Sequence, residues 1–278
     1  MILQTKNLSF SYGGFGLEDV SIEIKRGSIC GLLGTNGSGK STFFNCCMKF
    51  LSIKGGEIYV GSQNTKHKSP AWMAKNIAYV AQHTELHFPF FVRDIVLMGR
   101  STHIQTFGTP SPQDVAIARQ ALADLGIDDL ARRDFAQLSG GQRQLVLAAR
   151  ALATEAPIML LDEPTSALDV HNQDRLLTLL HRLSRERGLT ILFTTHQPNH
   201  ALAVAHKTLL MTQPQARFGP TATVLTVDNL KQLFDIDMIR LPAQFNGQRF
   251  ENIMPVYATQ LGACHARIRP PTDPKSVD

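Results

Sequence analysis

The chain has 278 residues, of which 43% are hydrophobic, with 28 Lys and Arg against 23 Asp and Glu. This length can bury a large core. No window approaches the ~18–20 consecutive apolar residues that cross a bilayer, so a helical integral membrane protein is excluded, and the composition excludes a disordered chain. The first residues lack a basic segment followed by an apolar run, so we expect no secretory signal. The net charge of +5 includes a lysine-rich stretch over residues 40–75, which is compatible with phosphates, a nucleic acid or an anionic membrane surface as partners, or with a simply solvated face.

The four cysteines, Cys30, Cys46, Cys47 and Cys264, form no C-x-x-C pair and no metal-ligand spacing. Cys46 and Cys47 are adjacent in a predicted helix, where their side chains diverge too far to form a disulfide. We therefore expect reduced, buried cysteines and a cytosolic protein.

Two kinds of strand pattern follow each other along the chain. Residues 2–24 alternate apolar and polar positions, which predicts half-buried strands of an antiparallel sheet. Short apolar runs that each end in polar residues predict buried, parallel strands with helices between them, in an α/β fold. In such sheets ligands bind beyond the carboxyl ends of the strands. The runs are 29–33, 77–81, 158–161 and 191–193.

Four helices are predicted from caps and periodicity. Ser111-Pro112-Gln113-Asp114 is a capping box that opens a helix towards residue 126, and Ser139 with Gln142 has the same spacing before a helix ending near residue 152. Leucines predict a helix over 171–187, which stops at Gly188, and residues 226–234 predict a further helix. We expect an α/β core formed by about 1–83 and 157–215, a helical insertion of about 84–156, and a C-terminal extension of about 216–278.

A glycine-rich segment between the first buried strand and a helix matches G-x-x-x-x-G-K-[ST], the P-loop pattern. Its glycines let successive backbone N–H groups point at phosphate oxygens, and the following helix directs its positive end at the same anion. Lys40 would reach the β- and γ-phosphates, and the Ser41 hydroxyl would bind Mg²⁺. The candidate nucleotide-binding residues here are Gly34, Asn36, Gly37, Ser38, Gly39, Lys40, Ser41 and Thr42.

Two adjacent carboxylates, Asp162 and Glu163, end the strand over 158–161. Behind a P-loop, this arrangement predicts a phosphoryl-transfer site. Asp162 would hold Mg²⁺, and Glu163, which points the opposite way, would polarise the attacking water.

The segment Leu138-Ser139-Gly140-Gly141-Gln142-Arg143-Gln144 resembles the signature sequence of the ATP-binding-cassette (ABC) ATPases. The resemblance extends from about residue 10 to at least residue 206 and implies a P-loop NTPase (RecA-like) core with an antiparallel β-subdomain and an inserted helical subdomain. Further positions of this sequence match the family's motifs in the expected order: Tyr12, Gln82, Ser166-Ala167-Leu168-Asp169 and His196.

The resemblance implies that ATP is held between two head-to-tail copies. The γ-phosphate of the partner's nucleotide would be bound by Ser139, Gly140, Gly141 and Gln142. These residues begin a predicted helix, and the backbone amides at a helix N-terminus can bind an anion. His196 would contact the γ-phosphate and Asp169 would act across the interface. Gln82 would connect Mg²⁺ and the attacking water to the insertion. Tyr12 would stack on adenine, an interpretation that we favour over that of an ordinary strand aromatic.

One cassette without a membrane span or a coiled-coil insertion favours the ATPase subunit of an importer over a soluble ABC ATPase that acts on nucleic acid. The resemblance implies a homodimer, two permease subunits docked near residues 83–108, an indirectly coupled substrate-binding protein, and a peripheral position on the cytoplasmic face of the inner membrane. We expect no nucleic-acid partner.

The stretch Val92–His103 resembles the docking segment of importers for iron–siderophores, haem and cobalamin. Within that class the chain, including residues 193–199, is most similar to a molybdate/tungstate importer ATPase, with metal chelates as the alternative cargo. His83, His87, Met98 and His103 fit no ligand spacing, so we assign them to the docking surface rather than to a metal site. The apolar run 88–92 is either insertion core or partner groove.

Two positions depart from the family pattern. Thr35 replaces a common proline, which leaves the backbone amides in place, and Gln197 replaces the usual Asp after His196.

Overall fold

The computed structural model describes residues 1–13, 15–82, 89–105, 107–212 and 215–257. The chain divides into two compact units, residues 1–226 and 227–278. None of the described helices is both long enough and apolar enough to cross a bilayer.

The antiparallel sheet predicted near the N-terminus is present. It has the strand order β2-β1-β4-β5, and the register pairs Leu3 with both Ile24 and Val60. Because side chains alternate between the two faces of a strand, one face of this sheet is almost fully buried. Its strands are β1 (Leu3–Tyr12), β2 (Phe15–Ile24), β4 (Gly55–Val60) and β5 (Gln63–Asn64).

A second sheet of six strands forms the centre of the unit, in the order β10-β9-β3-β8-β7-β6. All neighbours are parallel except β10, which runs antiparallel to β9. The four predicted buried strands are confirmed as β3, β6, β7 and β8, whereas β9 and β10 were not predicted. The strands are β3 (Ile29–Leu33), β6 (Ile77–Val80), β7 (Ile158–Leu161), β8 (Thr190–Thr195), β9 (Lys207–Met211) and β10 (Ala216–Pro220).

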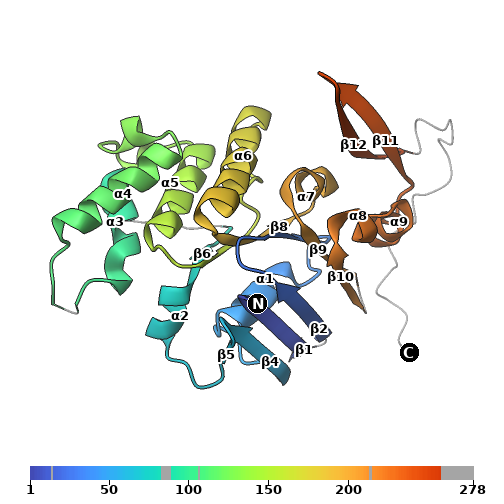
Figure 1. Cartoon of the computed structure of the whole chain (residues 1–278), viewed down its shortest axis with the longest axis horizontal. Coiled ribbons are helices and arrows are strands. Elements are labelled where there is room, and N and C mark those ends of the chain that lie inside the picture. Colours follow the sequence, from blue (N-terminus) through green and yellow to red (C-terminus); the bar gives the residue numbers. More distant parts are fainter. Residues whose placement is uncertain (14, 83–88, 106, 213–214, 258–278) are drawn as a thin grey trace, which may run out of the picture. The chain divides into compact units, whose positions relative to one another are not determined.

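Each face of the central sheet contributes to a different core. Leu32, Leu160 and Leu192 point towards α1 (Lys40–Cys47) and the antiparallel sheet, whereas their neighbours in the strands point towards the helices on the other face. Figure 1 shows α1 between the two sheets. The core between the central sheet and the antiparallel sheet also encloses Cys30, Cys46 and Cys47, which are free thiols, as predicted. Burial raises the pKa of Cys30 to about 12 and that of Cys46 to about 11.

The remaining helices of the first unit include three of the four that were predicted from caps and periodicity, namely α4, α5 and α6. Both predicted capping boxes are formed. The helix predicted over 171–187 ends at Gly188, whose φ of 61° is the left-handed conformation that glycine adopts readily. The helices are α2 (Pro70–Asn76), α3 (Val92–Leu97), η1 (Met98–Thr102), α4 (Pro112–Asp124), η2 (Asp128–Leu130), η3 (Phe135–Gln137), α5 (Gly140–Ala153), α6 (Val170–Arg187), α7 (Pro198–Val204) and α8 (Thr221–Val224).

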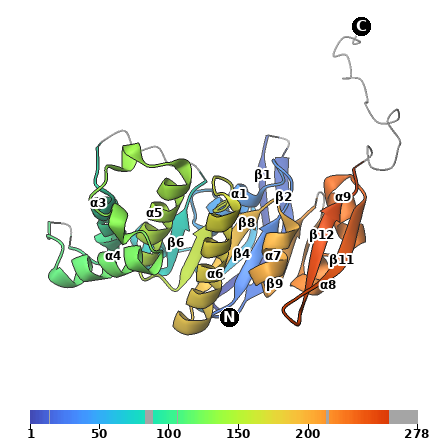
Figure 2. The same cartoon turned by 90° about the horizontal axis from the view of Figure 1, so that it is seen from above.

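Helices α3, α4 and α5 pack against one another at one end of the unit, as Figures 1 and 2 show. The apolar run over 88–92 is divided between two environments: Val92 is fully buried and Phe90 packs on the core, whereas Phe91 is 47% exposed. Phe88, like His83 and His87, lies outside the described residues.

The described part of the second unit, residues 227–257, contains the predicted helix α9 (Val227–Phe234) and a hairpin that was not predicted, β11 (Met238–Phe245) with β12 (Gln248–Pro255). Leu230 and Ile253 are buried within it. The hairpin turns at Asn246 and Gly247, both of which have positive φ, as two-residue hairpin loops require.

Candidate functional site

The P-loop lies between β3 and α1, where the sequence places it. Gly39 precedes α1 with φ of 97° and Gly37 has φ of 77°, both in the left-handed region that favours glycine. A Cβ at Gly34 would lie 2.2 Å from Ser38 Oγ, so a side chain there would displace the Ser38 hydroxyl from its position in the loop. Asn36, Gly37 and Ser41 are exposed, while Thr42 is half-buried in the first turn of α1.

The Lys40 side chain is held inside the loop. Its Nζ donates to Gly34 O at 2.9 Å and to Thr35 O at 3.0 Å, and it lies 3.5 Å from Glu163 Oε1. Ser38 Oγ is buried and has no hydrogen-bond partner among the described residues. A buried ammonium beside an unsatisfied hydroxyl and a row of turn amides is suited to an incoming anion.

Asp162 and Glu163 follow β7 and are buried, with their side chains directed differently. Asp162 Oδ1 accepts a 2.6 Å hydrogen bond from Thr194 Oγ1, and Asp162 Oδ2 lies 3.4 Å from the Tyr79 hydroxyl. Burial, followed by the Asp162 carboxylate, raises the pKa of Tyr79 to about 12, so its hydroxyl keeps its proton. Thr194 and Tyr79 were not assigned to the site from the sequence, because their contacts depend on which strands are neighbours in the sheet.

Three predicted residues from separate strand exits surround the Glu163 carboxylate. Lys40 Nζ lies 3.5 Å from Oε1, Gln82 Nε2 donates to Oε2 at 3.2 Å, and His196 Nδ1 lies 3.6 Å from Oε2. Glu163 has φ of 46°, an unfavourable conformation for a non-glycine residue. Its backbone N–H donates to Thr194 Oγ1 at 2.7 Å, and this hydrogen bond helps to hold the backbone in that conformation. The structure thus brings the P-loop lysine, the carboxylate and two polar side chains to one edge of the sheet.

The signature residues occupy a separate pocket of about 480 Å³ at the start of α5. Ser139 Oγ accepts from Gln142 N at 3.3 Å, and Gln142 Oε1 accepts from Ser139 N at 3.1 Å. Gly140 and Gly141 line the same pocket, and Asp169 faces them from the start of α6, where its Oδ1 accepts from Asn172 N at 2.8 Å. No residue of the P-loop lines this pocket.

Tyr12 lies at the end of β1, 74% exposed, with its ring stacked at 6.5 Å on that of Phe10. An exposed ring with one free face can accept a flat partner, as adenine stacking requires.

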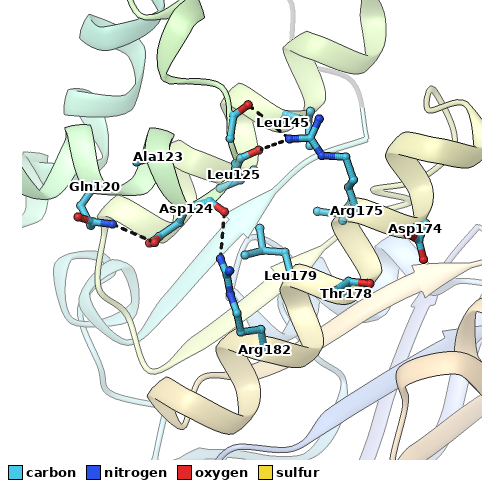
Figure 3. Close-up of a pocket in the computed structure, with 12 residues that line it drawn as sticks. Gln120, Ala123, Asp124, Leu125, Leu145, Asp174, Arg175, Thr178, Leu179 and Arg182 are labelled. Carbon is cyan, nitrogen blue, oxygen red and sulfur yellow. Dashed lines mark hydrogen bonds between the residues drawn. The ribbon is translucent and has the colours of Figure 1, made fainter.

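Another pocket, of about 420 Å³, lies along the seam between α4 and α6 (Figure 3). Arginines of α6 span the seam: Arg175 donates to the backbone carbonyls of Leu125 and Gly126, both at 3.4 Å, and Arg182 donates to Asp124 O at 3.2 Å. These carbonyls end α4, where a helix attracts positive charge. Arg175 also lines the signature pocket, so the seam connects directly to the signature.

Among the described residues there is no group of three or more His, Cys, Asp or Glu side chains placed to hold a metal ion. His103 instead lies beside α5, with Nε2 2.9 Å from Thr154 O.

Comparison with known proteins agrees with this arrangement. The model of the ABC transporter family matches residues 17–166. The chain is 42% identical to the molybdate import ATP-binding protein MolC of Haemophilus influenzae, over 93% of this chain and 98% of that protein. It is 37% identical to the iron(3+)-hydroxamate import ATP-binding protein FhuC of Bacillus subtilis, over 84% of this chain and 88% of that protein.

Solved structures give the same family. A chain from an inward-facing ABC transporter assigned to the metal-chelate type is 42% identical, with a TM-score of 0.85, over 93% of this chain and 98% of that chain. A dimeric ATP-binding cassette bound to ADP and Pi is 27% identical, with a TM-score of 0.69, over 79% of this chain and 99% of that chain. The chain belongs to the ABC transporter family and is an ATP-binding ATPase subunit of the importer class.

Proposed function

We propose that two copies of the chain hydrolyse ATP at sites shared between them, each formed by the P-loop of one copy and the signature of the other. The observation that carries this proposal is the separation of the two halves within one chain. Lys40 and Glu163 lie together at the edge of the sheet, whereas Ser139 lies in a pocket that no P-loop residue lines. A nucleotide on the P-loop therefore needs a second chain to reach a signature, and a dimeric relative bound to ADP and Pi supports this arrangement.

The residues around Glu163 divide the chemistry among them. Lys40 exchanges its carbonyl partners for the β- and γ-phosphates, which frees Glu163 to accept a proton from the attacking water. His196, 47% exposed in its side chain, is placed to contact the γ-phosphate, and Gln82 holds the water near Glu163. Asp169 stabilises the closed dimer from across the interface, and Tyr12 stacks on adenine.

The side chains beside the P-loop fit Mg²⁺. The candidate ligands are oxygen donors, which this ion prefers: the Ser41 hydroxyl, the Asp162 carboxylate and the Gln82 amide. Asp162 is already oriented by Thr194, as a ligand or an outer-sphere acceptor needs to be. When bound, the ion would neutralise charge on the phosphates.

The partners follow from the same proposal. Residues of about 84–156 form the helical insertion and those near 83–108 dock two permease subunits, so the chain works on the cytoplasmic face of the membrane. The core is then about 1–83 with 157–215, and the C-terminal extension of about 216–278 begins with β10, which pairs with β9 of the central sheet. A substrate-binding protein acts on the chain only through the permease.

For the cargo we propose molybdate or tungstate. The molybdate relative is 42% identical over 93% of this chain, against 37% over 84% for the iron-hydroxamate relative. The iron-hydroxamate relative and the structure of the metal-chelate type make an iron or metal chelate the alternative.

The test is to purify the chain with its permease and measure ATPase activity with candidate binding proteins loaded with molybdate, tungstate or an iron–hydroxamate. We expect the oxyanion-loaded protein to raise turnover and the iron-loaded one to leave it unchanged. Stimulation by the iron chelate alone would overturn the cargo, and stimulation by nucleic acid would overturn the importer function.

A further inference from the structure

The segment that we propose to dock the permease rests on the C-terminal end of the signature helix α5. This docking segment comprises residues 92–103, and includes α3 and η1. At Gly99 the two backbones meet: a Cβ there would lie 2.2 Å from Arg150 O, so no other residue allows this approach. Val92, Ile95 and Val96 are fully buried in the same core as α5.

Arg100 fixes this contact with three short bonds. Its Nε donates to Asp114 Oδ1 at 2.9 Å, and its Nη1 donates to Ala153 O and to Glu155 Oε2, both at 2.8 Å. The Arg100 side chain is only 5% exposed. Separating a buried guanidinium from its carboxylates and carbonyl would leave an uncompensated charge, so this connection is rigid.

The two carboxylates come from different elements. Asp114 belongs to the capping box of α4, and hydrogen bonds from Ser111, then from Arg100, lower the pKa of its carboxyl to about 2. Glu155 lies just beyond α5. One side chain of the docking segment therefore joins the start of α4 and the end of α5.

The signature helix thus has two different ends. Its first turn, at Ser139, lines the signature pocket, and its last carbonyls contact Arg100 and His103 of the docking segment. Cations at a helix C-terminus are favourable. With 14 residues, α5 spans about 21 Å between the two ends.

We propose that Arg100 is a positioning residue that ties the docking segment to the signature helix, so that both move as one body when ATP binds. This rests on the proposed function, in which a γ-phosphate contacts Ser139. A displacement at the start of α5 is then transmitted along a rigid helix to the surface that meets the permease. The contact at Gly99 prevents inward sliding, and the bonds of Arg100 prevent separation.

The first test uses the isolated chain and amide hydrogen exchange with and without a non-hydrolysable ATP analogue. In the wild type we expect slower exchange both in residues 139–150 and in residues 92–102. In Arg100→Met we expect the response to persist over 139–150 and to be lost over 92–102. Arg119→Met, which removes an exposed arginine of α4, is the matched control and should behave like the wild type.

Two outcomes would overturn the inference and are distinguishable from each other. An unchanged response of residues 92–102 in Arg100→Met means that Arg100 does not transmit the motion. No response of residues 139–150 in the wild type means that ATP does not reach a signature, which overturns the shared site and the inference with it. Should Arg100→Met fail to fold, Glu155→Ala removes one bond at a half-exposed position and should weaken the response of residues 92–102.

The second test uses the complex with the permease. We expect Arg100→Met to reduce permease-stimulated ATPase by at least about fivefold, the size of a typical coupling between sites, while basal ATPase stays near that of the wild type. Glu155→Ala combined with Arg100→Met should add no further loss, because both break one connection. Additive losses, or equal losses of basal and stimulated activity, would show a merely structural role.

Discussion

The Thr194 hydroxyl donates a 2.6 Å hydrogen bond to Asp162 Oδ1 and accepts a 2.7 Å bond from Glu163 N, so one side chain of β8 holds both the Asp162 carboxylate and the Glu163 backbone at the end of β7. All three residues are buried, and Thr194 has no accessible surface. The neighbouring Glu163 backbone has positive φ, a conformation that these bonds help to maintain.

Thr194→Val should therefore impair hydrolysis more than nucleotide binding. The substitution keeps the shape but leaves Glu163 N and Asp162 Oδ1 without their partner, which we expect to cost about 1–3 kcal/mol of stability. We expect ATPase activity to fall about tenfold or more, as for other residues that orient metal-site ligands. Urea unfolding and steady-state ATPase assays measure the two effects.

Thr190→Val is the matched control for that change. Thr190 is equally buried at the opposite end of β8, and its hydroxyl accepts from Gly27 N at 3.1 Å. It should destabilise the fold similarly while retaining most ATPase activity. Equal losses of activity in the two variants would contradict the role given to Thr194.

Glu163→Gln should retain ATP binding and lose most turnover. The amide keeps the size and the contacts with Gln82 and His196 but cannot accept a proton, which we expect to reduce the rate by about 10²–10⁴-fold. ATP should then accumulate in a closed dimer, visible by size-exclusion chromatography. Near-normal hydrolysis would remove Glu163 from its proposed role.

Much of the site was predictable because it consists of contiguous motifs whose chemistry depends on spacing along the chain. The P-loop and the Asp162–Glu163 pair are of this kind, and each lies where the strand pattern places it. Thr194 was not predictable, because its role requires β8 to lie beside β7 in register, which no local pattern specifies. The short helix α3 has only six residues, too few for a period of 3.6 to be recognised.

The hairpin of the second unit was missed although its sequence carries a signal. Asn246-Gly247 is a strong indicator of a two-residue turn between strands. Pro242 obscures it, because a proline inside an alternating run argues against a paired strand. Only Met238 of β11 and Ile253 of β12 are buried, so few positions of the hairpin need to be apolar.

Ser139→Arg should block ATP-driven dimerisation while leaving ATP binding by each copy intact. A long cation at the first turn of α5 would fill the signature pocket and lose the bond to Gln142 N, but it lies in a different pocket from Lys40. Ser111→Arg is the matched control, since Ser111 has the same capping role at the start of α4. Sedimentation with ATP should show monomers for Ser139→Arg and dimers for Ser111→Arg; dimers for both would contradict the shared site.

The histidine beside the site gives a prediction on pH. Burial, and next the nearby His196, lower the pKa of His200, whose Nδ1 lies 3.2 Å from Thr165 Oγ1. As the pH falls through about 6.5, the unfolded chain gains a proton at His200 that the folded chain resists. The contribution of His200 to the free energy of unfolding is therefore fully present above pH 6.5. It declines below that pH, until the pH reaches the lowered pKa of the folded state. His200→Gln should lose less stability than the wild type between pH 7.5 and 5.5 in urea unfolding. His181→Gln, at an exposed position of α6, controls for the loss of an ordinary histidine, and equal pH slopes for all three proteins would contradict the assignment.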